Sequence, residues 1–167
     1  EEELQLSHHT ADHSEDYYNH DVLTHLYTRC KYEHDLKVFQ LANYARLTCI
    51  YMDAVGLHEI NNHLGHEAGD HMLCSIADGI RKYFPDDCAY RIGGDEFAVM
   101  LDINLSPDQL EHLLTQFLRD ISGILEQVTV SCSIGAYRFV FPQEIKHLLT
   151  ETDHVLYQAK ENGRACF

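Results

Sequence analysis

Positive charge is scarce in this sequence. Its 167 residues hold 12 Lys and Arg against 27 Asp and Glu, which gives a formal net charge of −15. Six of the acids and no Lys or Arg lie within residues 1–20, so the remainder carries −9. Non-specific nucleic-acid binding requires an excess of cations that displaces counterions, and we therefore expect no nucleic-acid partner. An acidic domain can still bind a nucleotide if metal ions neutralise the phosphates.

Long apolar runs are also absent. No stretch reaches the roughly 18 apolar residues of a membrane-spanning helix, and no basic and apolar leader opens the sequence. The six cysteines form no Cys-x-x-Cys pair, and the 13 histidines lack the fixed spacing of a zinc site. We expect reduced thiols, mostly surface histidines and no membrane contact by this domain. The expected location is the cytoplasm. This location also suits a domain that forms the cytoplasmic part of a membrane-anchored protein.

The length suits one domain with its own core. Residues 1–20 are polar and acidic without periodicity and are interpreted as a tail or linker remnant, with the domain at 21–167. Apolar spacings of three and four predict helices, and alternation predicts strands. In chain order we expect a helix from near Arg29, a strand over 47–52, a short helix and turn near Gly65, a helix over 69–83, a turn at 85–87, a hairpin around Gly93 and Gly94, a helix from Ser106 and Pro107, a strand over 128–136 with one buried face, and a helix over 142–162.

This order of elements is βααββαβ after an N-terminal helix. Strands mixed with crossover helices favour an α/β sandwich of the ferredoxin-like type. The predicted core is a central mixed sheet flanked by helices. No internal repeat and no second domain are visible in the sequence.

The hairpin stretch Arg91–Phe97 reads R-I-G-G-D-E-F. Glycine reaches positive φ without steric cost, so Gly93 and Gly94 predict a tight turn between two strands. Asp95 and Glu96 follow the turn directly. Two rigidly held carboxylates suit a hard metal ion, and adjacent glycines let a phosphate approach the backbone. Taken alone, the stretch fits a surface hairpin with solvated acids equally well.

Further candidate residues lie at the ends of predicted elements. Asp53 follows a buried strand, where a carboxylate serves either as a metal ligand or as a cap. Lys160 and Arg164 lie four residues apart around Gly163, at the end of the last predicted helix. Basic residues there either complement the helix dipole or bind a phosphate.

Five stretches in chain order resemble motifs of the GGDEF domain of diguanylate cyclases, which are bacterial signalling enzymes. The resemblance runs from Asp21 to Arg164 and implies a nucleotide-cyclase-like fold. D-V-L-T-H-L-Y-T-R at 21–29 resembles D-x-L-T-G-L-x-N-R, and I-N-N-H-L-G-H followed by G-D at 60–70 resembles I-N-D-x-x-G-H-x-x-G-D. The signature at 91–97 is intact. V-S-C-S-I-G at 130–135 and the stretch at 153–164 resemble T-x-S-x-G and A-D-x-A-L-Y-x-A-K-x-x-G-R.

The resemblance implies that two GTP molecules are condensed to cyclic di-GMP and pyrophosphate. Each domain of a homodimer would hold one GTP, and two divalent cations, Mg²⁺ or Mn²⁺, would act per active site. A sensory or receiver domain is expected upstream. The implied roles are metal binding for Asp53, Asp95 and the Ala54 carbonyl, catalysis for Glu96 with Asp95, guanine recognition for Asn61 and Asp70, phosphate binding for Lys160, Arg164, Leu57 and His58, and close nucleotide approach at Gly93 and Gly94.

The stretch after Asp53 departs from the family pattern D-x-D-x-F-K. Val55, Leu57 and His58 replace its second Asp, its Phe and its Lys, which predicts slower turnover or weaker GTP affinity. Phe84 replaces the Arg of the family's inhibitory R-x-x-D site, so no feedback inhibition is expected there. Two alternatives stay open: a degenerate GGDEF domain that binds GTP and regulates an attached domain without catalysis, and a related cyclase with another base preference, against which Asp70 argues.

Overall fold

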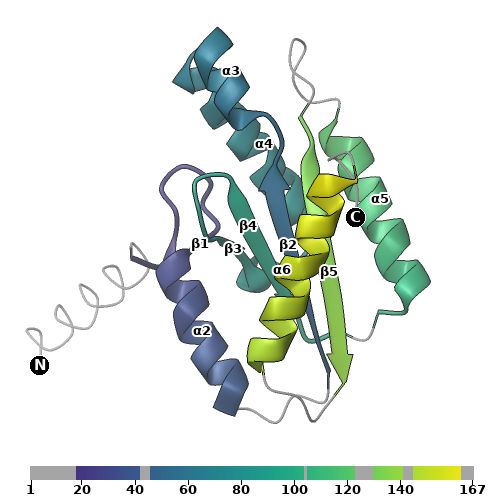
Figure 1. The fold of residues 1–167 in the computed structure, drawn as a ribbon. Coiled ribbons are helices and arrows are strands. Elements are labelled where there is room, and N and C mark those ends of the chain that lie inside the picture. The colour runs from purple at the N-terminus through teal and green to yellow at the C-terminus, as the bar shows by residue number, and fades with distance from the viewer. Residues whose placement is uncertain (1–17, 42–45, 104, 123–129, 141–144, 163–167) are drawn as a thin grey trace, which may run out of the picture.

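The computed structural model describes residues 18–41, 46–103, 105–122, 130–140 and 145–162 (Figure 1). The strands form one five-stranded sheet in the order β1-β3-β4-β2-β5. β1 pairs with β3 in parallel and the other pairs are antiparallel, which confirms the predicted mixed sheet. The strands are β1 (Tyr27–Thr28), β2 (Arg46–Ala54), β3 (Ala89–Arg91), β4 (Glu96–Leu101) and β5 (Cys132–Val140).

Helices cover both faces of this sheet (Figure 1). One face carries α2 (Arg29–Leu41) and α6 (Ile145–Glu161), and the other carries α4 (His66–Tyr83) and α5 (Pro107–Ile121). The short helix α3 (Leu57–Leu64) packs on α4 beyond the ends of the strands (Figure 1). The predicted α/β sandwich is therefore confirmed.

Successive residues of β2, which lies between β4 and β5, enter two separate cores. Ile50 and Met52 belong to the cluster beneath α4 and α5, whereas Leu47 and Cys49 belong to the cluster with Tyr32 of α2 and Leu148 of α6. This alternation follows from the pleat of a strand, which points neighbouring side chains to opposite faces. Asp53 lies on the same face as Leu47 and Cys49, toward α2 and α6.

The prediction that the strand over 128–136 has one buried face is wrong. Cys132 and Ile134 are buried on one face, and Ser133 and Gly135 are buried on the other. The small residues indicated a solvent face, but α6 packs on them. A Cβ built on Gly135 would lie 2.2 Å from the Leu156 backbone nitrogen, so glycine allows the helix to contact the strand backbone directly. The strand also runs to Val140, and residues 128 and 129 lie outside the described chain.

Other predicted boundaries shift by a few residues. β2 extends through Asp53 to Ala54, so Asp53 lies inside the strand. α4 begins at His66 and includes Gly69, whose missing side chain accommodates Asn61 of α3. A 3-10 helix over Asp86–Cys88 occupies part of the predicted turn. The first three residues of the helix predicted over 142–162, and residues 1–17 of the expected tail, lie outside the described residues.

The helix predicted from Ser106 is confirmed with its cap. The Ser106 hydroxyl accepts a hydrogen bond from the Gln109 amide, and the Gln109 side chain accepts one from the Ser106 amide. This capping box satisfies amide groups that a helix start leaves without partners. The described histidines are exposed or half-buried, as expected, and the described cysteines are free thiols.

Candidate functional site

Asp53 and Glu96 lie directly opposite each other on β2 and β4. Directly opposed residues of an antiparallel pair point to the same face, and both point here toward the side covered by α2 and α6. The Ala54 amide donates to the Asp95 carbonyl at 2.9 Å, which joins the end of β2 to the turn of the hairpin. Strand pairing therefore brings the signature acids beside Asp53, although 42 or 43 residues separate them in sequence.

A cavity of about 340 Å³ opens at this end of the sheet, and we call it the Asp53 pocket. Its wall combines the end of β2, the start of α3, the hairpin turn and the last turn of α6. The lining residues are Asp53, Ala54, Val55, Gly56, Leu57, His58, Glu59, Asp95 and Lys160. Six residues predicted to bind metal or phosphate, all except Arg164, therefore meet in one cavity. Arg164 lies outside the described residues.

Lys160 makes an ion pair with Asp53 in this pocket. Its Nζ lies 2.6 Å from Asp53 Oδ2, and the two side chains are 35% and 19% exposed. Lys160 is one helical turn beyond Leu156, the residue whose backbone meets Gly135, so the close contact of α6 with β5 places the lysine above the sheet. The sequence indicated a basic helix end but gave no signal for this pairing.

The donors in the Asp53 pocket are of the kind that Mg²⁺ and Mn²⁺ bind. The carboxylates of Asp53, Asp95 and Glu59 and the backbone of Ala54 line it, and hard divalent cations prefer oxygen ligands. No group of three or more His, Cys, Asp or Glu side chains close enough to hold a metal ion occurs within the described residues. The residues thus fit a cation that is shared with oxygens of a bound substrate, such as phosphates, and do not form an all-protein cage.

The start of α3 supplies the rest of the pocket wall. Gly56 precedes the helix with φ 84°, a left-handed backbone that favours glycine. The first amides of a helix lack intrahelical partners and attract anions, and Leu57, His58 and Glu59 of this first turn line the pocket. The His58 ring nitrogen Nε2 lies 3.0 Å from the Asn62 amide nitrogen, so His58 has a partner on its own helix.

Asn61 and Asp70 lie where α3 packs against α4, beside the Asp53 pocket and not in its wall. The Asn61 side-chain oxygen is buried and has no hydrogen-bond partner among the described residues. It lies 2.0 Å from the position that a Cβ of Gly69 would take, so only glycine fits there without a shift. Asp70 follows Gly69 and is exposed. A buried acceptor without a partner is costly in a folded protein and is often explained by a ligand.

The hairpin has the predicted position but not the predicted backbone. The glycines with left-handed φ are Gly56 and Gly65, not Gly93 or Gly94, within the part of the chain that the structure describes. A Cβ on Gly93 would lie 2.5 Å from Glu96 Oε2, so a side chain there would require the Glu96 carboxylate to move. Space within 4 Å of a Cβ on Gly94 is open, which fits the expected close approach of a nucleotide.

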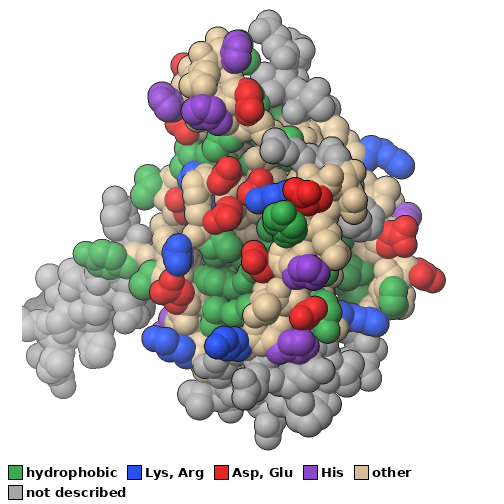
Figure 2. All heavy atoms as spheres, in the orientation of Figure 1, with side chains coloured by type: hydrophobic (Ala, Val, Ile, Leu, Met, Phe, Trp, Pro, Cys, Tyr) green, Lys and Arg blue, Asp and Glu red, His purple; other side chains and the backbone are tan. Residues whose placement is uncertain are grey.

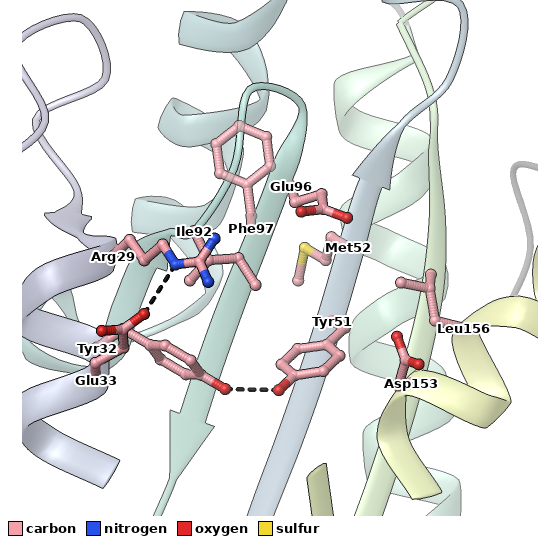
Figure 3. A pocket seen from close by; sticks show the side chains of 10 residues that line it. All are labelled: Arg29, Tyr32, Glu33, Tyr51, Met52, Ile92, Glu96, Phe97, Asp153 and Leu156. Carbon is pink, nitrogen blue, oxygen red and sulfur yellow. Dashed lines mark hydrogen bonds and ion pairs between the residues drawn. The ribbon is translucent and has the colours of Figure 1, made fainter. Parts of the chain in front are cut away.

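Asp95 and Glu96 line different cavities, although they are adjacent in sequence. Glu96 belongs to a second cavity of about 250 Å³, the Glu96 pocket, between α2, α6 and the sheet (Figure 3). An apolar hollow on this face is bordered by Asp and Glu side chains, mainly above it, and by Lys and Arg side chains to its left and below (Figure 2). Tyr32 and Tyr51 face each other there with their hydroxyls 2.6 Å apart. The lining residues are Arg29, Tyr32, Glu33, Tyr51, Met52, Ile92, Glu96, Phe97, Asp153 and Leu156.

Burial dominates the titration of the tyrosine pair. The pKa values of Tyr32 and Tyr51 are both raised well above the ordinary value of 10, first by burial and then by their neighbours. Both phenols are therefore neutral at physiological pH, and they hold α2 against β2 beside Glu96. Sequence reasoning placed Tyr32 only in the apolar stripe of a helix and did not find this cavity.

The family model described as diguanylate cyclase, GGDEF domain, matches residues 18–166. The diguanylate cyclase DgcS of Shewanella oneidensis is 32% identical over 151 residues, covering 88% of this chain and 51% of DgcS. The diguanylate cyclase TpbB of Pseudomonas aeruginosa is 32% identical over 156 residues, covering 87% of this chain and 36% of TpbB. The chain thus spans about half or less of these relatives.

Solved structures agree with this result. The coiled coil and GGDEF domain of DgcB from Caulobacter crescentus, in complex with c-di-GMP, superposes with a TM-score of 0.88 over 99% of this chain and 94% of that one. At 17% identity this likeness shows the fold alone. The GGDEF domain of TpbB superposes with a TM-score of 0.74 at 29% identity, over 88% of this chain and 91% of that one.

The chain belongs to the GGDEF family of diguanylate cyclases. The family fold expected from the motifs is confirmed. Within the described residues, no helix is long and apolar enough to cross a membrane.

Proposed function

We propose that this domain condenses two GTP molecules into cyclic di-GMP, as a homodimer whose two domains face each other. The observation that carries the proposal is the Asp53 pocket, where Asp53, Asp95, Lys160 and the first turn of α3 meet. The two carboxylates suit a divalent metal ion, and the lysine and the N-terminal amides of α3 suit the phosphates of a metal-bound triphosphate. When bound, two divalent cations, Mg²⁺ or Mn²⁺, held by Asp53, Asp95 and the Ala54 carbonyl would offset the triphosphate charge.

The chain's own groups then have separate tasks. The N-terminal amides of α3, beside Leu57 and His58, and the ammonium of Lys160 bind phosphate oxygens, with Arg164 assigned to the same task. Asn61 and Asp70 bind the guanine edge, because a carboxylate accepts hydrogen bonds from N1–H and N2–H₂ groups that adenine does not offer at those positions. The buried Asn61 oxygen without a partner supports this assignment.

Glu96 is assigned to the attacking hydroxyl. It lies across from Asp53 and lines the neighbouring pocket, so it sits at the edge of the proposed phosphate site. In each of two rounds, the 3′-oxygen of one GTP bonds to the α-phosphorus of the other, and the bond from that phosphorus to the bridging oxygen breaks. Pyrophosphate leaves, and Glu96 accepts the hydroxyl proton.

A second candidate function is GTP binding without catalysis, in regulation of an attached domain. The observation that favours it lies in the same pocket: Val55, Leu57 and His58 line the wall where the family pattern has an acid, a phenylalanine and a lysine. Fewer charged groups therefore face the proposed substrate. An upstream sensory or receiver domain remains part of either proposal.

One assay separates the two functions. The protein is incubated at high concentration, because a dimer is needed, with GTP and Mg²⁺ or Mn²⁺, and the nucleotides are separated by chromatography. Cyclic di-GMP or linear pppGpG is expected. Binding of GTP in equilibrium dialysis without either product would overturn the cyclase proposal in favour of regulation. Equal product formation from ATP would overturn the roles of Asn61 and Asp70.

A further inference from the structure

Lys160 is held at the carboxylate that the proposed metal must use. Its ammonium lies 2.6 Å from Asp53 Oδ2, across 107 residues of sequence. No other Lys or Arg lines the Asp53 pocket, whose described wall also carries the acids Glu59 and Asp95. The pair is partly buried, with the Asp53 side chain 19% and the Lys160 side chain 35% exposed. A half-buried carboxylate without a counter-charge is unfavourable, so Lys160 compensates Asp53 within the protein itself.

A divalent cation and the Lys160 ammonium cannot both occupy Asp53 Oδ2 in this geometry. A metal ion would lie about 2.1 Å from the oxygen, and two positive charges would then repel each other at short range in a half-buried site. A metal ion that binds Oδ2 must therefore displace the ammonium, and one that binds Oδ1 of the same carboxylate would still lie close enough to repel it. The backbone of α6 is fixed against β5 at Leu156 and Gly135. The ammonium must therefore move by rotation about the bonds of the flexible four-carbon lysine side chain.

We propose that Lys160 is a counter-ion that exchanges between Asp53 and the nucleotide. It neutralises Asp53 until a divalent cation takes the carboxylate, and the released ammonium then binds a phosphate oxygen. Lys160 is thus a positioning residue that couples the two binding events, and the coupling acts equally in both directions. The inference rests on the proposed function, since it assumes a metal at Asp53 and a nucleotide in the same pocket.

The exchange makes a distinct prediction for metal binding without any nucleotide. A lysine held away from Asp53 would weaken metal binding only slightly, through repulsion across the pocket, whereas a lysine that occupies the carboxylate competes with the metal directly and weakens binding more. Removal of the ammonium should therefore tighten metal binding, although it removes a group from the proposed active site. Lys160→Met keeps the apolar stem of the side chain and deletes the charge.

The test uses Mn²⁺ alone as the probe, with free Mn²⁺ measured by electron paramagnetic resonance. Lys160→Met should bind Mn²⁺ about tenfold more tightly than the wild type, within the usual range for coupled sites. Lys146→Met is the matched control, because Lys146 is an exposed lysine at the other end of α6. It should leave the Mn²⁺ affinity unchanged. Circular dichroism checks folding, and Lys160→Gln repeats the experiment if the Met variant does not fold.

Asp53→Asn distinguishes failure of the exchange from failure of the metal site. If Asp53→Asn loses Mn²⁺ binding but Lys160→Met binds no more tightly than the wild type, the exchange is overturned and the proposed metal site stands. If Asp53→Asn binds Mn²⁺ as well as the wild type, the metal assignment fails and the exchange fails with it. Tighter binding by Lys160→Met together with loss of binding by Asp53→Asn supports both.

Discussion

Arg91 connects the turn that presents Asp95 to Asp21, 70 residues earlier in the chain. Its Nη1 donates to Asp21 Oδ1 at 3.0 Å, and its Nη2 donates to the Gly94 carbonyl at 2.7 Å. Asp21 Oδ1 also accepts hydrogen bonds from the Thr24 amide at 2.8 Å and the Thr24 hydroxyl at 2.6 Å. The first and third motifs of the resemblance therefore form one structural unit, in which Asp21 supports the hairpin from outside the pocket.

Asp21→Asn should lower the free energy of unfolding by about 1–3 kcal/mol, because it removes a charge-assisted contact and leaves the half-buried Arg91 without its counter-charge. Urea unfolding followed by circular dichroism measures the change. Asp87→Asn is the control on an exposed acid, where a change within about 0.5 kcal/mol is expected. Equal effects of the two substitutions would contradict the structural role of Asp21.

The same contact predicts a pH dependence. Burial alone would raise the Asp21 pKa, but hydrogen bonds from Thr24 and Arg91 outweigh it and hold the pKa below the ordinary 3.8. A carboxyl group with a lowered folded-state pKa stabilises the fold above its unfolded pKa, and this contribution is lost as the pH falls through the folded value. The stability gap between wild type and Asp21→Asn should therefore narrow below pH 3.8. A gap of constant size on acidification would contradict this.

His25→Gly should stabilise the fold. His25 has φ 58° and is the described non-glycine residue with a left-handed backbone, at the position where the family motif carries glycine. The left-handed conformation costs a residue with a Cβ about 1–2 kcal/mol, and glycine returns about 0.5–1 kcal/mol of that through its more flexible unfolded state. We expect a net gain of about 0.5 kcal/mol in urea unfolding. His34→Gly, within α2, should instead destabilise by about 1 kcal/mol.

Asp95→Ala should abolish cyclic di-GMP formation, because the proposed metal site then keeps only one of its two carboxylates. The change is measured by product chromatography at saturating GTP and Mn²⁺. Asp102→Asn, on an exposed acid just beyond β4, controls for loss of one negative charge near the same strand and should leave turnover unchanged. Activity that survives Asp95→Ala would show that the metal assignment is wrong.

His58→Lys should tighten GTP binding several-fold, because it returns a fixed positive charge to the wall of the Asp53 pocket. Equilibrium dialysis with labelled GTP measures the affinity. His63→Lys adds the same charge on an exposed part of α3 outside the pocket wall and should have a smaller effect. If the two variants gain equally, the improvement reflects the overall charge of the domain and not a contact at position 58.

Cyclic di-GMP should not inhibit the proposed activity through the position of Phe84. Phe84 is 4% exposed and packs in the core against Phe117, with ring centroids 6.3 Å apart, so it offers no charge to a nucleotide. Initial rates with and without added cyclic di-GMP measure the effect, with a phosphodiesterase-treated sample as the reference. Inhibition that persists in Phe84→Leu would place a product site elsewhere on the domain, and inhibition abolished by that change would contradict the prediction.

Local signals in the sequence predicted most of the elements. Ser106 and Pro107 predict the start of α5, and the Gly-Gly pair predicts the hairpin. Both predictions succeed because helix caps and turns depend on residues that are close in sequence. The error at Ser133 and Gly135 has the opposite origin. Small residues that alternate with apolar ones suggest a solvent face, but a helix distant in sequence covers them. Burial of a strand depends on tertiary packing, which periodicity alone does not encode.

The partners within the site were less predictable than its members. The motifs identified Asp53, Asp95, Glu96 and Lys160, because each lies in a stretch with a recognisable pattern. They did not predict that Asp53 opposes Glu96 or that Lys160 contacts Asp53. Those relations depend on strand register and on the distance between α6 and the sheet, which contacts between distant residues determine.

The absence of a side chain at Gly135 sets the distance between α6 and the sheet beside the proposed active site, because Leu156 of α6 packs directly on this glycine. Because backbone meets backbone there, α6 packs close to the sheet, and Lys160 lies within ion-pair distance of Asp53. Any methyl group at position 135 would lift the helix and with it the ammonium. Gly135 pairs with Tyr51 of β2, and Asp53 lies two residues beyond Tyr51 on that strand. Selection at Gly135 would therefore act on the ion pair that neutralises Asp53.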